Sequence, residues 1–132
     1  MIAMGSIAGT SRVVIDEMRK EGHPIGLVKL RTFRPFPTEE LRELAKGVKA
    51  IGFIDRCRNP GSPGGGIGSI ETAKALYSLE ERPLLLSYYA GLVGRDVRPK
   101  EIENIAKKVL KAAETGRIEN EVEWVQLRDE SR

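Results

Sequence analysis

The chain has 132 residues, of which 40% are hydrophobic and 31% charged, a balance typical of a globular protein with one domain. Its formal net charge of +3 comes from 22 basic and 19 acidic residues mixed along the sequence, which is too dilute for nucleic-acid binding. No apolar run approaches the roughly 20 residues that span a bilayer, and no secretory leader is evident. We therefore expect a cytoplasmic protein with no nucleic-acid or membrane partner.

The cysteine and histidine content limits metal and redox chemistry. Cys57 is the only cysteine and His23 the only histidine, so neither a four-thiolate iron–sulfur cluster nor a His/Cys zinc site fits. Cys57 also has no second cysteine to react with, and no serine or carboxylate set accompanies His23. We expect no catalytic residue and no metal ligand in this chain. The abundance of Glu, Lys and Arg favours a thermophilic source.

Strand and helix patterns alternate along the chain with short connections. In order, we expect a strand at 2–4, a turn at 5–11, a helix to about 21, a strand at 25–32, a helix at 38–46, a strand at 48–54, a helix at 67–81, a strand at 84–89, a helix at 99–114 and a strand or docking segment at 121–127. Such alternation predicts a mainly parallel sheet with helices on both faces, a three-layer α/β fold. We expect one domain over 1–132, with 1–127 as its ordered core and 128–132 as a tail.

Apolar spacing also predicts which face of each helix is buried. In the third helix the apolar positions at helical spacing are Ile67, Ile70, Ala73, Leu76 and Tyr77. Apolar residues at this spacing are typical of the buried face of a helix. The strand at 84–89 is apolar almost throughout, so we expect helices on both of its faces.

A glycine-rich loop follows the third strand and is the first candidate site. It contains Gly64, Gly65 and Gly66 and lies where α/β proteins place ligands or partner surfaces, although it does not match the dinucleotide-binding fingerprint. Two interpretations stay open. The loop cradles a phosphate group on the following helix, or its glycines allow close backbone packing against another domain.

A second candidate anion site is the short segment before the first helix. Its residues are Ser6, Gly9, Thr10 and Ser11. A phosphate on the helix N-terminus is one interpretation. The other is a plain turn in which the hydroxyl side chains cap the helix.

Two opposite-charge pairs follow neighbouring strands and should lie at one edge of the sheet. They are Asp55 with Arg56 and Arg95 with Asp96. Either they bind an anionic ligand or a partner protein, or they form ion pairs with one another that hold the two loops together.

Four blocks of the sequence resemble one known family in order and spacing. They are residues 3–6, 30–37, 55–66 and 91–97, with Phe-Arg-Pro-Phe-Pro at 33–37 and Gly-Arg-Asp-Val at 94–97 as the most specific. Together they resemble the C-terminal domain of the alpha subunit of pyruvate:ferredoxin oxidoreductase and its 2-oxoacid:ferredoxin relatives. The resemblance covers nearly the whole chain and implies a transketolase C-terminal-like domain.

The resemblance also implies a function for the whole enzyme. Family enzymes decarboxylate a 2-oxoacid, with pyruvate expected here, on thiamine diphosphate with Mg, pass electrons through iron–sulfur clusters to ferredoxin, and form an acyl-CoA. The cofactor contacts belong to other domains and subunits, and no family catalytic residue maps onto this chain. The resemblance thus implies a structural domain that contacts the rest of alpha and the beta, gamma and delta subunits. Our hypothesis is that Arg34, Arg95 and Asp96 make the directional contacts.

This sequence departs from the family pattern in residues 57–63, which are more basic and richer in proline. The chain is either a fragment or a separately encoded piece. The alternative function is a free-standing domain that binds a phosphate or CoA-type ligand through the glycine loop. A third possibility is a domain that associates with itself.

Overall fold

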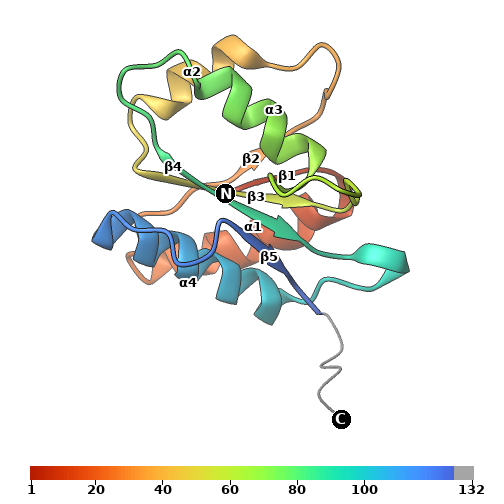
Figure 1. Ribbon diagram of the computed structural model, residues 1–132. Helices are drawn as coiled ribbons and strands as arrows, with labels where there is room; N and C mark the ends of the chain where they lie inside the picture. Colours follow the sequence, from red (N-terminus) through yellow and green to blue (C-terminus); the bar gives the residue numbers. More distant parts are fainter. Residues whose placement is uncertain (127–132) are drawn as a thin grey trace.

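The structure, a computed structural model, describes residues 1–126 as an α/β domain built on a five-stranded sheet (Figure 1). The strand order is β2-β1-β3-β4-β5, and every pairing is parallel. The elements are β1 Ile2–Ala3, α1 Gly5–Lys20, β2 Val28–Lys29, α2 Thr38–Ala45, β3 Ala50–Asp55, α3 Ile67–Leu76, β4 Leu84–Tyr89, the 3-10 turn η1 Leu92–Gly94, α4 Pro99–Thr115 and β5 Val122–Trp124. The predicted α/β fold is confirmed, while the tail expected at 128–132 lies outside the described residues.

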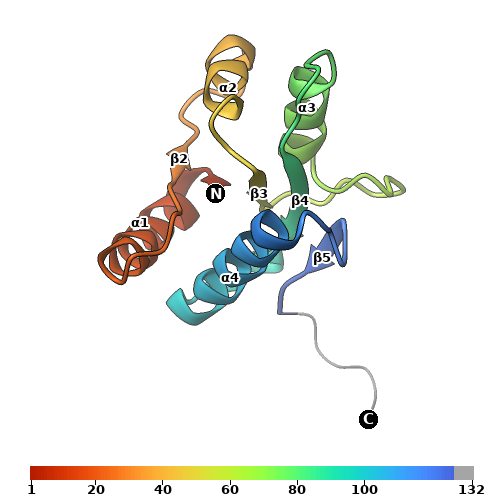
Figure 2. The same cartoon turned by 90° about the vertical axis from the view of Figure 1, so that its left-hand side faces the viewer.

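Two helical layers cover the sheet, with α1 and α4 on one face and α2 and α3 on the other (Figure 2). Alternate side chains of β3 pack into the two hydrophobic cores, one on each face of the sheet. Ile54 packs with the α1 and α4 side, whereas Ile51 and Phe53 pack with the α2 side. A parallel strand covered on both faces has no polar face, which explains the apolar run predicted for the central strands. Among residues 1–126, none of the helices has the length and apolar character that a bilayer crossing requires.

Several predicted boundaries match the structure, whereas three do not. One of these is the end of the third helix, expected at 81 but found at Leu76. β4 has the predicted limits, and α4 starts at Pro99 and ends at Gly116, whose φ of 69° places it in the left-handed conformation that ends helices. The second strand is shorter than the predicted 25–32 and covers Val28–Lys29. The turn predicted at 5–11 is also wrong, because α1 begins at Gly5 directly after β1.

The buried face of α3 differs from the predicted one. Ile67, Ile70 and Tyr77 are 40%, 37% and 70% exposed. Small side chains line the buried face instead, namely Gly68, Ser69, Thr72 and Ala75, together with Leu76. At the start of the helix no larger residue fits, because a Cβ added at Gly68 would lie 2.2 Å from the ring of Phe53 in β3.

Parallel strands bring all their carboxyl ends to one edge of the sheet. Residues 55–66, which follow β3, and residues 91–97, which follow β4, therefore lie at the same carboxyl edge. The opposite, amino edge carries the turn between α1 and β2 and the start of β3.

Candidate functional site

The centre of the carboxyl edge is the side chain of Asp55, which caps the N-terminus of α3. Its Oδ1 accepts a hydrogen bond from the backbone amide of Gly68 at 2.9 Å. Its Oδ2 accepts from the amide of Ser69 at 3.2 Å and from the hydroxyl of Ser69 at 2.8 Å. The hydroxyl of Ser87 in turn donates to Ser69 Oγ at 2.7 Å. A carboxylate of this chain thus occupies the position where a helix N-terminus would bind an anion.

The environment of Asp55 combines burial with hydrogen bonding. Burial raises the pKa of the Asp55 carboxyl above its ordinary value of 3.8, and the hydrogen bonds from Ser69 and Gly68 oppose that rise. Asp55 is 8% exposed, so the donors to its carboxylate replace the water that the group loses on folding. It is therefore a structural anchor between β3 and α3.

The glycines of the loop allow it to lie directly on the strands. A Cβ added at Gly65, whose φ is +92°, would lie 2.2 Å from the hydroxyl of Ser87. A Cβ at Gly66 would lie 2.3 Å from the carboxyl carbon of Asp55. Gly64 differs, since its Cβ would make only an ordinary contact of 3.6 Å. Close backbone packing, one of the two interpretations, is thus present, but against β3 and β4 of the same domain.

The arginines of this edge do not form the ion pairs between the two loops that the sequence suggested. Arg56 donates to the hydroxyl of Ser6 at 3.0 Å, which links the loop after β3 to the start of α1. Arg95 donates to the carbonyl of Gln126. The side-chain amide of Gln126 donates to the carbonyl of Asp96 at 2.6 Å, so the loop after β4 is tied to the residues after β5. No ion pair joins the two loops within residues 1–126.

Arg34 lies on the α2 and α3 side of the domain. Its guanidinium forms an ion pair with Glu71 of α3 at 2.9 Å and stacks over the ring of Phe33 at 4.4 Å. Because the Arg34 side chain is 61% exposed, the pair leaves part of the guanidinium open to a partner.

Sequence reasoning missed the most exposed apolar residue of this edge. Val93, in η1, is 98% exposed and has a φ of 56°, in the left-handed region that β-branched residues avoid. Its neighbours Gly91 and Gly94 also have positive φ values of 71° and 72°. The spacing of the two glycines predicted a turn. It did not indicate that the turn exposes an apolar side chain to solvent.

The second missed feature is an aromatic cluster next to the glycine loop. Trp124 of β5 stacks on Tyr89 of β4 with ring centroids 4.3 Å apart, and the guanidinium of Arg58 lies 5.6 Å from the Trp124 ring. Trp124 is 41% exposed, so it packs against the sheet while one side stays open.

The predicted anion segment before the first helix is not a loop. Gly9, Thr10 and Ser11 lie inside α1, and Ser11 is buried. The hydroxyl of Thr10 bonds to the carbonyl of Ser6 at 3.3 Å, within the helix. Only Ser6 reaches the carboxyl edge, as the acceptor of Arg56.

The donor set of the described residues does not fit a metal site. No group of three His, Cys, Asp or Glu side chains within residues 1–126 is placed to hold a metal ion. Cys57 is exposed and stands alone, so a four-thiolate cluster does not fit. A metal ion or a four-thiolate cluster of the kind that the resemblance implies for the whole enzyme therefore has no ligand set among residues 1–126.

The fold and this edge define a class of protein. It is a parallel three-layer α/β domain whose carboxyl-edge loops are packed on their own strands while their arginines and Val93 face solvent. The family model described as pyruvate:ferredoxin oxidoreductase core domain II matches residues 1–102. The chain belongs to this family.

Curated relatives agree with the family match. The chain is 43% identical to the ketoisovalerate oxidoreductase subunit VorA of Pyrococcus furiosus over 127 residues, which cover 96% of this chain and 32% of the relative. It is 40% identical to the pyruvate synthase subunit PorA of Pyrococcus horikoshii over 129 residues, 98% of this chain and 32% of the relative. The PorA subunit of Thermotoga maritima is 38% identical over 129 residues, with the same two shares. The chain thus spans about a third of the length of these relatives, whose sources fit the thermophilic origin expected from composition.

Proposed function

We propose that this chain is a structural and assembly domain of the alpha subunit of a 2-oxoacid:ferredoxin oxidoreductase, working in the cytoplasm. Its carboxyl edge binds other domains and subunits of the enzyme, among them beta, gamma and delta, and it supplies no catalytic group. Arg34, Arg95 and Asp96 provide directional contacts, and Val93 provides an apolar one. Ferredoxin is an indirect partner, since it receives electrons from the clusters of other subunits.

The observation that carries this proposal is the carboxylate of Asp55 on the N-terminus of α3. The amides of Gly68 and Ser69 would be the anion-binding groups of a glycine loop, and both already bind Asp55. This weighs against the alternative, a free-standing domain with a phosphate or CoA-type ligand on this loop. What the edge presents to solvent is the exposed side chains of Arg56, Arg95 and Val93, which suit a protein surface.

The substrate is a 2-oxoacid, and the relatives' names point to two acids. One relative is named for ketoisovalerate and the other for pyruvate, at 43% and 40% identity. These two identities are too similar to distinguish ketoisovalerate from pyruvate as the substrate. When bound in the complete enzyme, thiamine diphosphate stabilises the carbanion that decarboxylation produces. We propose that oxoacid selectivity lies in the domains that bind this cofactor.

Recovery of partner subunits on the tagged chain tests the proposal. We expect the wild-type chain to bind a thiamine-diphosphate-binding subunit and an iron–sulfur subunit from the extract of its source organism, identified by mass spectrometry. Arg95→Ala should reduce recovery at least tenfold, whereas Arg12→Ala, a matched change on the exposed side of α1, should not. No recovery from an extract with active enzyme, together with saturable CoA binding, would favour the alternative.

A further inference from the structure

The helix α3 has a second, mostly apolar side that faces solvent. This side, here called the α3 seam, consists of Ile67, Ile70, Lys74 and the C-cap residue Tyr77, all of which are exposed. At 100° per residue the seam lies opposite the small buried residues that face the sheet. A helix that is apolar on two opposite sides is typical of one that is covered on both.

The spacing of the seam is that of a contact between two helices. Its residues recur at intervals of three, four and three along the chain, which is the heptad pattern of a helix that packs along one partner helix. Lys74 occupies one position of this pattern, and the other three positions are apolar. At a rise of about 1.5 Å per residue, the seam is about 15 Å long. A partner helix of about three turns would therefore cover it.

The seam continues the carboxyl edge of the sheet. A Cβ added at Gly64 would lie 3.6 Å from Cγ1 of Ile70, so the glycine loop lies against the seam. Glu71, next to Ile70 in the helix, forms the ion pair with Arg34 at 2.9 Å. Arg34, one of the proposed directional contacts, thus lies beside the seam. A partner that binds the carboxyl edge reaches α3 without crossing another surface.

The charges around the seam favour an acidic partner. The amine of Lys74 lies 6.0 Å from the centroid of the Tyr77 ring, and the guanidinium of Arg82 lies 5.5 Å from it. Neither cation forms an ion pair within residues 1–126, although Glu80 and Glu81 are close in sequence. Covering Lys74 with a partner costs free energy unless an acid faces the amine. The partner therefore needs a carboxylate opposite Lys74.

The same charge argues against a second copy of this chain as the partner. In an antiparallel pair of α3 helices Lys74 would face Ile70, and in a parallel pair it would face a second Lys74. The acid nearest to it in the helix, Glu71, already binds Arg34. Neither symmetric pair supplies Lys74 with a carboxylate.

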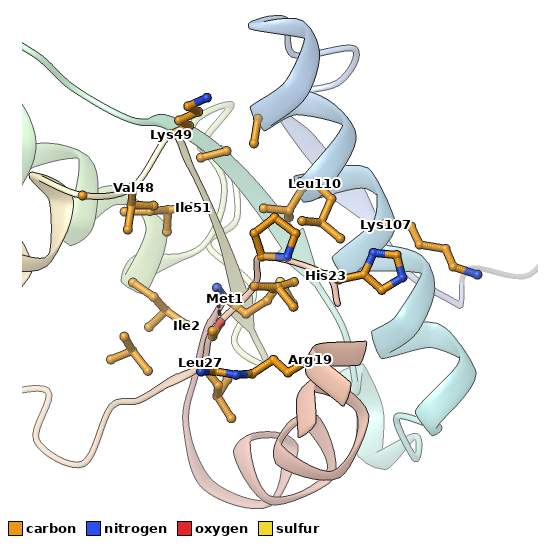
Figure 3. A pocket seen from close by; sticks show the side chains of 18 of the residues that line it. Met1, Ile2, Arg19, His23, Leu27, Val48, Lys49, Ile51, Lys107 and Leu110 are labelled. Atoms are coloured by element: carbon orange, nitrogen blue, oxygen red, sulfur yellow. Dashed lines mark hydrogen bonds between the residues drawn. The ribbon is translucent and has the colours of Figure 1, made fainter. Parts of the chain in front are cut away.

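The shape of the seam favours a protein over a small ligand. A cavity of about 700 Å³ lies elsewhere, at the amino edge, where His23, Lys107 and Leu110 are among its lining residues (Figure 3). Within residues 1–126, this lining includes none of the four seam residues. Small ligands bind in concave pockets, whereas the outer side of a helix fits another protein segment.

We propose that the α3 seam binds an amphipathic helix with an apolar stripe against Ile67, Ile70 and Tyr77 and a carboxylate opposite Lys74. Another part of the oxidoreductase supplies this helix, so the inference rests on the proposed function. The apolar side chains provide the contact area, and the ion pair of Lys74 fixes the register of the partner along the seam. The domain is then held by its carboxyl edge and by α3 together.

Zero-length cross-linking of the assembled enzyme tests the inference. A carbodiimide joins a lysine amine to a carboxylate only where the two groups are in contact. We expect a product between Lys74 and an aspartate or glutamate of another part of the oxidoreductase, identified by mass spectrometry, and none with Lys74→Arg. Lys108 and Glu123, 2.6 Å apart within this domain, are the internal control. Coupling of the control pair with no such product at Lys74 would overturn the inference.

Recovery of partner subunits on the tagged chain separates the inference from the proposed function. Lys74→Glu places an acid opposite the expected carboxylate and should reduce recovery at least tenfold at low salt. Arg12→Glu, the same change of charge on the exposed side of α1, should not. If Arg95→Ala reduces recovery while Lys74→Glu does not, the inference is overturned and the proposed function stands. If the wild-type chain recovers no partner, the proposed function fails and the inference fails with it.

Tyr77→Ala separates an assembly role of the seam from a structural one. Because the Tyr77 side chain is 70% exposed, its loss should leave the thermal unfolding of the chain unchanged while recovery falls several-fold. A lower unfolding temperature with unchanged recovery would overturn the proposal. Sedimentation velocity of the isolated chain tests the second copy, since a dimer that Tyr77→Ala abolishes would assign the seam to self-association instead.

Discussion

Ser69 binds the carboxylate of Asp55 twice, through its backbone amide at 3.2 Å and through its hydroxyl at 2.8 Å. The pair joins the last residue of β3 to the first turn of α3 across the glycine loop. Since both residues are buried, their hydrogen bonds cannot be replaced by water without opening this edge. The position of the whole loop thus depends on this contact.

Replacing Asp55 should destabilise the domain. Asp55→Ala leaves the amides of Gly68 and Ser69 without an acceptor, and we expect the free energy of unfolding to fall by about 3 kcal/mol or more. Asp55→Asn keeps the shape but replaces one accepting oxygen by an amide nitrogen that cannot accept, and should cost about 1–2 kcal/mol. Urea unfolding measures both. Asp96→Asn, an exposed control, should change stability by less than about 0.5 kcal/mol, and an equal loss there would contradict the anchor role.

The stability of the domain should depend on pH in the direction set by the raised pKa of Asp55. Since burial raises this pKa above 3.8, the folded chain holds the proton more tightly than the unfolded chain. Stability from this group is therefore greatest at low pH and declines as pH rises from 3.8 through the folded pKa. Asp55→Asn lacks this slope, so the difference between wild type and variant should shrink over that window. Urea unfolding from about pH 4 to pH 7 measures this difference between wild type and variant. A difference that grows with pH would mean that the hydrogen bonds to Asp55 outweigh its burial and lower its pKa.

Gly68 should tolerate no side chain. A Cβ there would lie 2.2 Å from the ring of Phe53, so Gly68→Ala should cost about 1–3 kcal/mol through overpacking. Gly9 is the matched control, because it lies in a helix with no atom within 4 Å of an added Cβ. Gly9→Ala should stabilise the domain by up to about 1 kcal/mol through helix propensity. Thermal unfolding of the two variants should move in opposite directions.

Replacing Val93 should affect the stability of the domain and its binding to partner subunits in different ways. Its φ of 56° costs a β-branched residue about 1–2 kcal/mol, and its exposed side chain gains nothing from packing in this domain. Val93→Gly should leave the free energy of unfolding unchanged or raise it by up to about 1 kcal/mol, since the flexibility of glycine in the unfolded chain offsets part of the gain. The same variant should bind the partner subunits more weakly. A loss of stability with unchanged binding would show that Val93 supports the loop and not the assembly.

Local signals account for the parts of the fold that could be predicted from the sequence. β4 is an apolar run that follows Pro83, and α4 has helical periodicity between Pro99 and Gly116, so their limits were predicted closely. The resemblance in four blocks led to the family that the comparisons show. At position 5, glycine suggested a turn, but α1 uses it as its first residue because the chain turns directly from β1 into the helix.

Contacts between distant residues account for what could not be predicted. Hydrophobicity placed Ile67 and Ile70 in the core, yet Phe53 and Asp55 leave room there only for small side chains. Asp55 stands beside Arg56 in sequence, which suggested charge pairing, but it binds the amide of Gly68, 13 residues further on.

Site-specific cross-linking from Cys57 tests the central claim most directly. Cys57 is the only cysteine, is exposed, and lies in the loop after β3, so a thiol-reactive photo-cross-linker can be attached at the proposed assembly surface alone. After irradiation in an extract containing the active enzyme, we predict a covalent product with another part of the oxidoreductase, identified by mass spectrometry. The same reagent on Arg12→Cys in a Cys57→Ser background should give none. An intact enzyme with no product from Cys57 would contradict the claim that this edge holds the domain in the assembly.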